Sequence, residues 1–178
     1  MNKKIIVISG KQFSGKDTVA DIIKGYFPDF KEIALAGAIK KEFGNKKGIT
    51  INEIERNKPL YRADLIDLGN KGRAESPDYW IKKVIAEEGN IIVPDLRLKY
   101  ELDTFRQYGA ITIRVESSRE ERSKRARLVS EEDPTETQLD NVNDWDFVIE
   151  NNGTIEDLKE KVAKLVAQLE KELYSHSN

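Results

Sequence analysis

One stretch decides the fold: Ile5-Ile-Val-Ile8, followed by Ser9-Gly-Lys-Gln-Phe-Ser-Gly-Lys-Asp-Thr18. The β-branched run predicts a short strand that is buried on both faces. The two glycines predict a tight turn, and apolar residues at helical spacing predict a helix directly after it. Those apolar residues are Val19, Ile22, Ile23 and Phe27.

The turn has the composition of a phosphate-binding loop. It matches the pattern GxxxxGK[ST] except at the last position, which is Asp17. Glycines let backbone N–H groups turn toward a phosphate, and the start of the helix adds its positive dipole end. Lys16, expected to be exposed in the loop, would reach the β- and γ-phosphates of a nucleotide. The residues expected to contact the nucleotide are Gly10, Lys11, Ser14, Gly15, Lys16, Asp17 and Thr18.

Asp17 stands where a Ser or Thr would normally bind Mg²⁺. A carboxylate is a good ligand for this hard cation, either directly or through water. Two alternatives stay open: the Thr18 hydroxyl could take that role, or Asp17 could only cap the helix. The second cation of the loop, Lys11, could contact a phosphate or remain solvated.

Short apolar runs predict four further strands, at 33–35, 91–93, 111–115 and 147–149. Helical segments between them imply a parallel sheet covered on both faces, in one three-layer α/β domain over residues 1–178. A loop is expected at 45–48, and a charged helix at 117–129. Ser76-Pro77 is expected to begin a helix, and Thr154 with Asp157 to cap the last one.

A second carboxylate and an arginine follow the strand at 91–93. Asp95 would lie beside the phosphate loop, because ligands of parallel sheets bind beyond the carboxyl ends of the strands. It could orient Mg²⁺ and accept a proton from the acceptor, or it could be a plain helix cap. Arg97 would hold a substrate phosphate with its planar guanidinium.

Arginines recur between residues 117 and 127. Arg119, Arg122 and Arg125 have the spacing i, i+3, i+6, which places them near one helix face. Such a helix could close as a lid, at about 116–141, with Arg119 and Arg125 on the nucleotide and Arg122 on the moving phosphoryl group. The alternative is a solvated helix with internal ion pairs.

The middle of the chain offers candidates for an acceptor site. One or more of four cations could hold an acceptor phosphate, although each alone is more often a surface charge: Lys40, Lys41, Arg62 and Arg73. Tyr61, Tyr79 and Trp80 could stack on a nucleobase.

Composition excludes several kinds of protein. The 178 residues include no cysteine, which rules out disulfides, thiolate zinc sites and a Cys nucleophile. The single histidine, His176, lies near the end of the chain, so a Ser-His triad is not expected. The net charge of −2 argues against nucleic acid or an anionic membrane as partner. We expect a cytoplasmic protein with no membrane span; a homodimer is compatible with the sequence.

The motifs resemble the P-loop monophosphate kinase superfamily, above all virus-encoded deoxynucleoside monophosphate kinases and animal-type phosphomevalonate kinases. The loop Ser-Gly-…-Ser-Gly-Lys-Asp matches Ser9 to Asp17, so the unusual aspartate becomes a family mark. The family's Leu-(Ala/Ser)-Gly-Pro-(Ile/Leu)-Lys resembles residues 35–40, and its Asp-Thr-Arg resembles residues 95–97. This chain departs from the pattern at Ala38 and Leu96. The segments at 105–112, 139–141 and 146–153 are similar as well.

The resemblance implies a P-loop NTPase fold with a helical lid, and catalysis with ATP and Mg²⁺. Lys16 and Lys11 would bind ATP phosphates, while Asp17 and Asp95 would organise the metal and the acceptor. Arg97 and Lys40 would hold the acceptor. The leading expectation is phosphoryl transfer to a deoxynucleoside monophosphate, in host cytoplasm if the protein is virus-encoded. The alternatives are 5-phosphomevalonate or dephospho-CoA as acceptor, or a non-catalytic nucleotide-binding module.

Overall fold

The computed structural model describes residues 2–175, so His176 lies outside the described part of the chain. It divides into two compact units. The first comprises Met1–Glu32 and Gly89–Asn178, and the second is the uninterrupted segment Ile33–Glu88. The expectation of a single domain over 1–178 stays a prediction.

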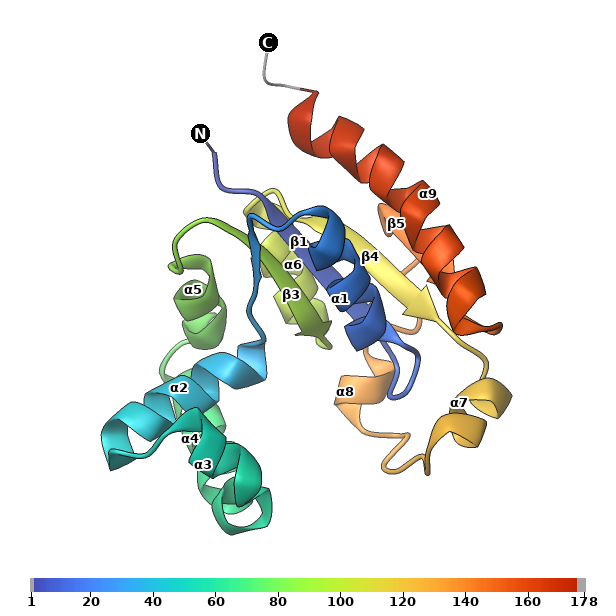
Figure 1. The fold of residues 1–178 in the computed structure, drawn as a ribbon. Helices are drawn as coiled ribbons and strands as arrows, with labels where there is room; N and C mark the ends of the chain where they lie inside the picture. The colour runs from blue at the N-terminus through green and yellow to red at the C-terminus, as the bar shows by residue number, and fades with distance from the viewer. Residues whose placement is uncertain (1, 176–178) are drawn as a thin grey trace. The chain divides into compact units, whose positions relative to one another are not determined.

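The first unit contains a five-stranded sheet in which every pairing is parallel, with the order β2-β3-β1-β4-β5 (Figure 1). This confirms the predicted parallel sheet. Because β1 lies between β3 and β4, the loop after β1 opens at the point where the strand order reverses, where parallel sheets bind ligands. The strands are β1 (Ile5–Gly10), β2 (Phe30–Glu32), β3 (Asn90–Leu96), β4 (Ile111–Glu116) and β5 (Phe147–Glu150).

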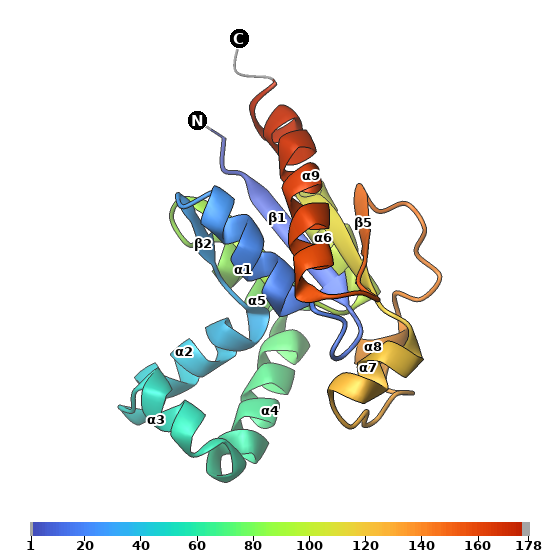
Figure 2. The same cartoon turned by 45° about the vertical axis from the view of Figure 1, so that its right-hand side comes forward.

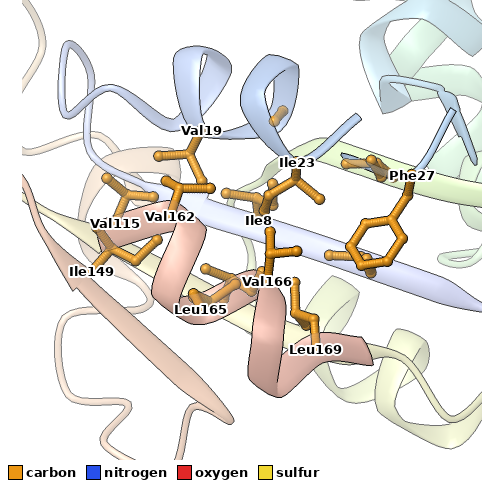
Figure 3. Packing of buried hydrophobic residues seen from close by; sticks show 14 of the residues in the cluster. Ile8, Val19, Ile23, Phe27, Val115, Ile149, Val162, Leu165, Val166 and Leu169 are labelled. Carbon is orange, nitrogen blue, oxygen red and sulfur yellow. The ribbon is translucent and has the colours of Figure 1, made fainter. Parts of the chain in front are cut away.

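Helices cover both faces of this sheet. Figures 1 and 2 show α1 (Lys16–Tyr26) and α9 (Ile155–Tyr174) on one face and α6 (Lys99–Gln107) on the other. The first face packs an apolar cluster in which Ile8, Val19 and Val162 are fully buried (Figure 3). As predicted, Thr154 caps α9 and forms a capping box with Asp157. Two short helices, α7 (Arg119–Arg125) and α8 (Pro134–Thr137), lie between β4 and β5 in the chain.

A register shift separates the two ends of the β1–β3 pairing. Val7 pairs with Val93, but Ser9 pairs with Leu96, so β3 has one extra residue over this stretch. Pro94 lies within the shift, where a missing N–H costs no ladder hydrogen bond. Bulges of this kind are common beside active sites, and Asp95 lies within this one.

The second unit is helical, and an aromatic residue forms its core. Trp80 is only 3% exposed, and its Nε1 donates to the carbonyl oxygen of Gly69 at 3.0 Å. Its ring packs against Gly72, and Phe43 contacts Tyr61 edge-on at 5.7 Å between ring centroids. The helices are α2 (Leu35–Lys47), α3 (Ile51–Arg56), α4 (Lys58–Glu75) and α5 (Tyr79–Ile85).

Several predicted boundaries were wrong. The strand expected at 33–35 lies at Phe30–Glu32 instead, and the expected loop at 45–48 is helical up to Lys47, because α2 ends only at the left-handed Gly48. Ser76 ends α4 rather than beginning α5. It precedes Pro77, and a proline disfavours the helical conformation of the residue before it. The charged helix expected at 117–129 covers only Arg119–Arg125 and ends at the extended Ala126.

Candidate functional site

The loop between β1 and α1 is tightly built around its glycines. A side chain at Gly10 would overlap Ser14 Oγ and approach Val115 O to 2.8 Å. Gly15 has a φ of +100°, and a side chain there would overlap the Asn151 amide. The glycines are therefore required by close approach and by backbone conformation.

A cavity of about 430 Å³ opens at this loop. Lys16, the first residue of α1, faces it but is only 7% exposed, so the expectation of an exposed lysine was wrong. Burial lowers the pKa of Lys16, and the neighbouring Arg97 lowers it further, whereas Asp17, Glu136 and Asp95 act in the opposite direction. The residues that line the cavity are Gln12, Phe13, Gly15, Lys16, Asp17, Thr18, Arg97 and Arg125.

The structure brings Asp17 and Asp95 near Lys16, as predicted from the sequence. Both carboxylates influence the pKa of Lys16, and Asp17 lines the cavity itself. Asp17 lies in the first turn of α1 and is an exposed residue. Ser14 Oγ is buried and has no hydrogen-bond partner in the described part of the chain, so the loop holds a polar group that a ligand could satisfy.

Two arginines also line the cavity. Within residues 2–175 the guanidinium of Arg97 has no hydrogen bond or ion pair to a protein group, although its backbone N–H donates to Glu101. Arg125 is fixed in place: it donates to the carbonyl oxygens of Phe13 at 2.8 Å and Asn151 at 2.7 Å. One cation is thus available to a ligand through its guanidinium, and the other is held by the backbone.

The remaining arginines of the predicted lid lie outside the cavity lining. Arg119 forms a two-bond ion pair with Glu131, at 2.9 Å for each bond. Arg122 is 5% exposed and donates to the carbonyl oxygens of Ser117 and Gln12. Their roles on ATP and in catalysis, like the lid itself, stay predictions.

The outer half of the loop is held by the segment after α7. Gln12 bonds the backbone N–H and carbonyl of Val129 through its side-chain amide, and its own N–H donates to Glu136. Lys11 pairs with Asp140 at 2.9 Å, so its predicted contact with a phosphate would require release from this carboxylate. These partners were missed from the sequence because they lie more than 100 residues away along the chain.

A second cavity, of about 200 Å³, shares Gly15, Thr18 and Arg125 with the first. Asn151 lines it as well, is 7% exposed, and donates to Ser14 O at 2.8 Å. The sequence predicted only a turn here. The position directly after β5 was the available signal, since site residues follow the carboxyl ends of parallel strands.

The second unit has a cavity of its own, of about 520 Å³, lined by Lys40, Lys58, Pro59, Arg62 and Leu65. Lys40 and Lys58 both pair with Glu55, and these two bonds lower the pKa of the Glu55 carboxyl. The other predicted acceptor ligand, Arg73, lies outside this lining and donates to Asn70 at 2.9 Å.

The aromatic platform expected for a nucleobase is not available at Trp80. This residue is buried in the core of the second unit and bonded to Gly69, so the expectation was wrong for it. Tyr79 is half-buried, and its hydroxyl donates to Glu42 at 2.9 Å.

Within residues 2–175, no group of three or more His, Asp or Glu side chains is arranged to hold a metal ion. No helix in the same range is both long and apolar enough to span a bilayer.

Two protein-family models match this chain. The phosphomevalonate kinase family model matches residues 8–110, more than half of the chain, and the deoxynucleotide monophosphate kinase model matches residues 75–162. Similar solved structures include a gluconokinase from Sinorhizobium meliloti 1021 (16% identity, 99% and 98% of the two chains, TM-score 0.58). TT1252 from Thermus thermophilus is 19% identical (95% and 99%, TM-score 0.60). An APS kinase from Mycobacterium tuberculosis, solved with AMPPNP and APS, is 12% identical (93% and 98%, TM-score 0.55).

The parallel sheet and the glycine loop, together with two matching kinase family models, assign the chain to the P-loop kinases of the nucleoside monophosphate and small-molecule type. Within that class, the chain belongs to the phosphomevalonate kinase family.

Proposed function

We propose that this kinase transfers the γ-phosphoryl group of ATP to the phosphate of a deoxynucleoside monophosphate, giving the diphosphate. One observation carries the proposal: Lys16 and Arg97 line the same cavity, and the pKa of Lys16 is lowered first by burial and then by the neighbouring charge of Arg97. Two neighbouring cations are stabilised by bound anions. Lys16 suits the phosphates of ATP, and the unpaired Arg97 guanidinium suits a second phosphate, that of the acceptor.

In this reaction an oxygen of the acceptor phosphate bonds to the γ-phosphorus as the bond to the ADP oxygen breaks. The protein contributes positioning and electrostatic stabilisation more than covalent chemistry. Lys16 and Arg97 neutralise charge on the two phosphates and align them. Backbone N–H groups of the loop bind phosphate oxygens, with Ser14 Oγ as a further group free to bond a ligand.

The residues present fit Mg²⁺. This ion is usually bound by one or two carboxylates together with water and substrate phosphates, so a site built on Asp17 and Asp95 needs no third protein acid. Thr18 also lines the cavity and offers a hydroxyl. When bound, Mg²⁺ would neutralise charge on the phosphates. Asp17 and Asp95 would hold the ion or its waters.

The purine of ATP is assigned to the second cavity of the first unit. This cavity shares Gly15, Thr18 and Arg125 with the phosphate cavity, as an ATP molecule that occupies both would require. The guanidinium of Arg125 is planar and held by backbone carbonyls, so it can stack on a base at little entropic cost. Asn151 and Thr154 add polar groups at its rim.

The cavity of the second unit supports a nucleotide as acceptor. Its volume of about 520 Å³ lies within the range of sites for drug-sized ligands, larger than a six-carbon acid needs. Pro59 and Leu65 supply apolar surface for a base and a deoxyribose. Arg62 has no ion pair or hydrogen bond within residues 2–175, so its guanidinium is free to stack or donate.

A second candidate acceptor is 5-phosphomevalonate. The family model that covers the whole second unit is that of phosphomevalonate kinase. The three cations around the cavity of the second unit would also suit the carboxylate of such an acid.

The test is a coupled ATP-consumption assay with Mg²⁺ against the four dNMPs, the ribonucleoside monophosphates, 5-phosphomevalonate and dephospho-CoA. Lys16→Met serves as the inactive control. Turnover with a dNMP at a kcat/KM well above that of the other acceptors is the expected result. Turnover restricted to 5-phosphomevalonate or dephospho-CoA would replace the acceptor and keep the mechanism. Binding of ATP without turnover on any acceptor would contradict the proposal.

A further inference from the structure

Phe13, within the phosphate loop, has an unusual backbone. Its φ is 59°, in the left-handed region that bulky side chains rarely adopt, and among the non-glycine residues described only Ser130 shares this feature. Strained residues of this kind persist where the surrounding structure imposes the conformation, and they cluster at functional sites.

The hydrogen bonds around Phe13 hold its backbone in this left-handed conformation. Arg125 donates to the Phe13 carbonyl at 2.8 Å, and Ser14 N–H donates back to Lys11 O at 3.0 Å. The preceding residue, Gln12, is clamped by its side-chain bonds to the backbone of Val129. The peptide bonds on both sides of Phe13 are thus fixed by separate parts of the first unit.

The ring of Phe13 is exposed to solvent despite this strained backbone. Phe13 is 44% exposed and lines the phosphate cavity, where every other described lining side chain carries a polar atom. The geometry of the turn does not explain why position 13 is a phenylalanine, since Gly or Asn adopts this φ at lower energetic cost. Burial does not explain it either, because the ring gains little from so exposed a position.

We infer that Phe13 shields the transferred phosphoryl group from water, an inference that rests on the proposed function. The ring lies in the same lining as Lys16 and Arg97, the two cations assigned to the reacting phosphates. The competing reaction is hydrolysis: a water oxygen bonds to the γ-phosphorus, the bond to ADP breaks, and the water proton passes to solvent. An apolar group at the mouth of the cavity displaces the water that this reaction needs.

The experiment compares ATP hydrolysis without acceptor and phosphoryl transfer with acceptor in Phe13→Asn. Asparagine tolerates the left-handed backbone, so the loop keeps its conformation while the ring is lost. We expect the ratio of hydrolysis to transfer to rise about tenfold, with no fall in Tm. Phe13→Leu, which keeps an apolar side chain, should restore most of the coupling. Tyr108→Asn, which removes a ring of similar exposure (46%) at the end of α6, should leave the ratio unchanged.

Three outcomes would overturn the inference. Wild-type rates of both reactions in Phe13→Asn would make the ring a bystander, and an equal fall in both rates would make it a structural or aligning group. If Phe13→Asn proves unstable, a raised ratio in Phe13→Leu alone would contradict shielding by apolar surface. A wild-type protein that binds ATP but transfers its phosphoryl group to no acceptor would instead refute the proposed function.

Discussion

The two units differ in how their cavity charges are balanced. In the first, Lys16 and Arg97 share a cavity and Arg97 lowers the pKa of Lys16. In the second, Lys40 and Lys58 share the single carboxylate of Glu55, and Arg62 is the lining cation without a partner among the described residues. Lys16 and Arg97 of the first cavity form no ion pair within residues 2–175, whereas the second cavity holds one unpaired cation beside apolar surface.

This difference in unpaired charge predicts that the first cavity determines how tightly phosphates bind and the second determines which acceptor is selected. Uncompensated cations favour any polyphosphate, whatever organic group it carries. In the second cavity the unpaired Arg62 lies beside Pro59 and Leu65. Such a cavity discriminates between acceptors by their shape and by one directional contact. The contrast predicts that variants of the first cavity affect all substrates alike, and that variants of the second affect acceptors selectively.

The largest effect is expected for Lys16→Met, which should lower kcat/KM at least 100- to 1,000-fold, in the range found when one stabilising donor is lost. The variant should also unfold at a higher temperature without ligand, because the wild-type lysine is charged while buried. The folded pKa of Lys16 lies below its unfolded value, so the unfolded chain binds more protons between the two and wild-type stability rises with pH there. Thermal unfolding at several pH values checks this. A Lys16→Met protein with unchanged turnover would refute the role of the loop.

Next in size is Asp17→Asn. It should lower Mg²⁺-dependent turnover by about 100-fold, the upper end of the effect of changes around metal ligands, while ATP-analogue binding without metal changes little. Titration calorimetry with and without Mg²⁺, beside steady-state kinetics, measures both. Asp21→Asn, one turn further along α1, is the matched control. Equal losses in turnover and metal-free binding would assign Asp17 to helix capping instead.

A selective effect is expected for Arg62→Gln. Loss of one charged contact should raise KM for the acceptor about tenfold, which is the scale of a hydrogen bond to a charged group, and leave KM for ATP unchanged. Arg56→Gln, on α3 of the same unit and outside the cavity lining, should change neither constant. A rise in both KM values for Arg62→Gln would remove the distinction between the two cavities.

The smallest functional effect is expected for Gly72→Ala, which acts on stability alone. The added methyl group would lie 2.7 Å from the Trp80 ring, so the variant should lose about 1–3 kcal/mol of unfolding free energy through overpacking. Well below Tm, ATP-analogue affinity should match wild type. Gly25→Ala, where nothing lies within 4 Å of the added atom, should not destabilise the protein. Chemical denaturation checks both variants.

The sequence predicted best those features that are determined by residues close together in the chain. The strand, glycine turn and helix at the start of the chain and the Thr154 capping box depend on neighbours a few residues apart, and the structure confirms these elements. Burial of Lys16 and Trp80 depends on packing across distant segments, so both were predicted wrongly. Asn151 and Glu136 join the loop from more than 100 residues away, and no periodicity or spacing in one sequence encodes such contacts.

The second unit is one unbroken insertion, Ile33–Glu88, between β2 and β3. All five strands and the phosphate loop belong to the rest of the chain. A recombination event with only two joints could therefore replace the helices of the second unit and leave the sheet and the phosphate loop intact.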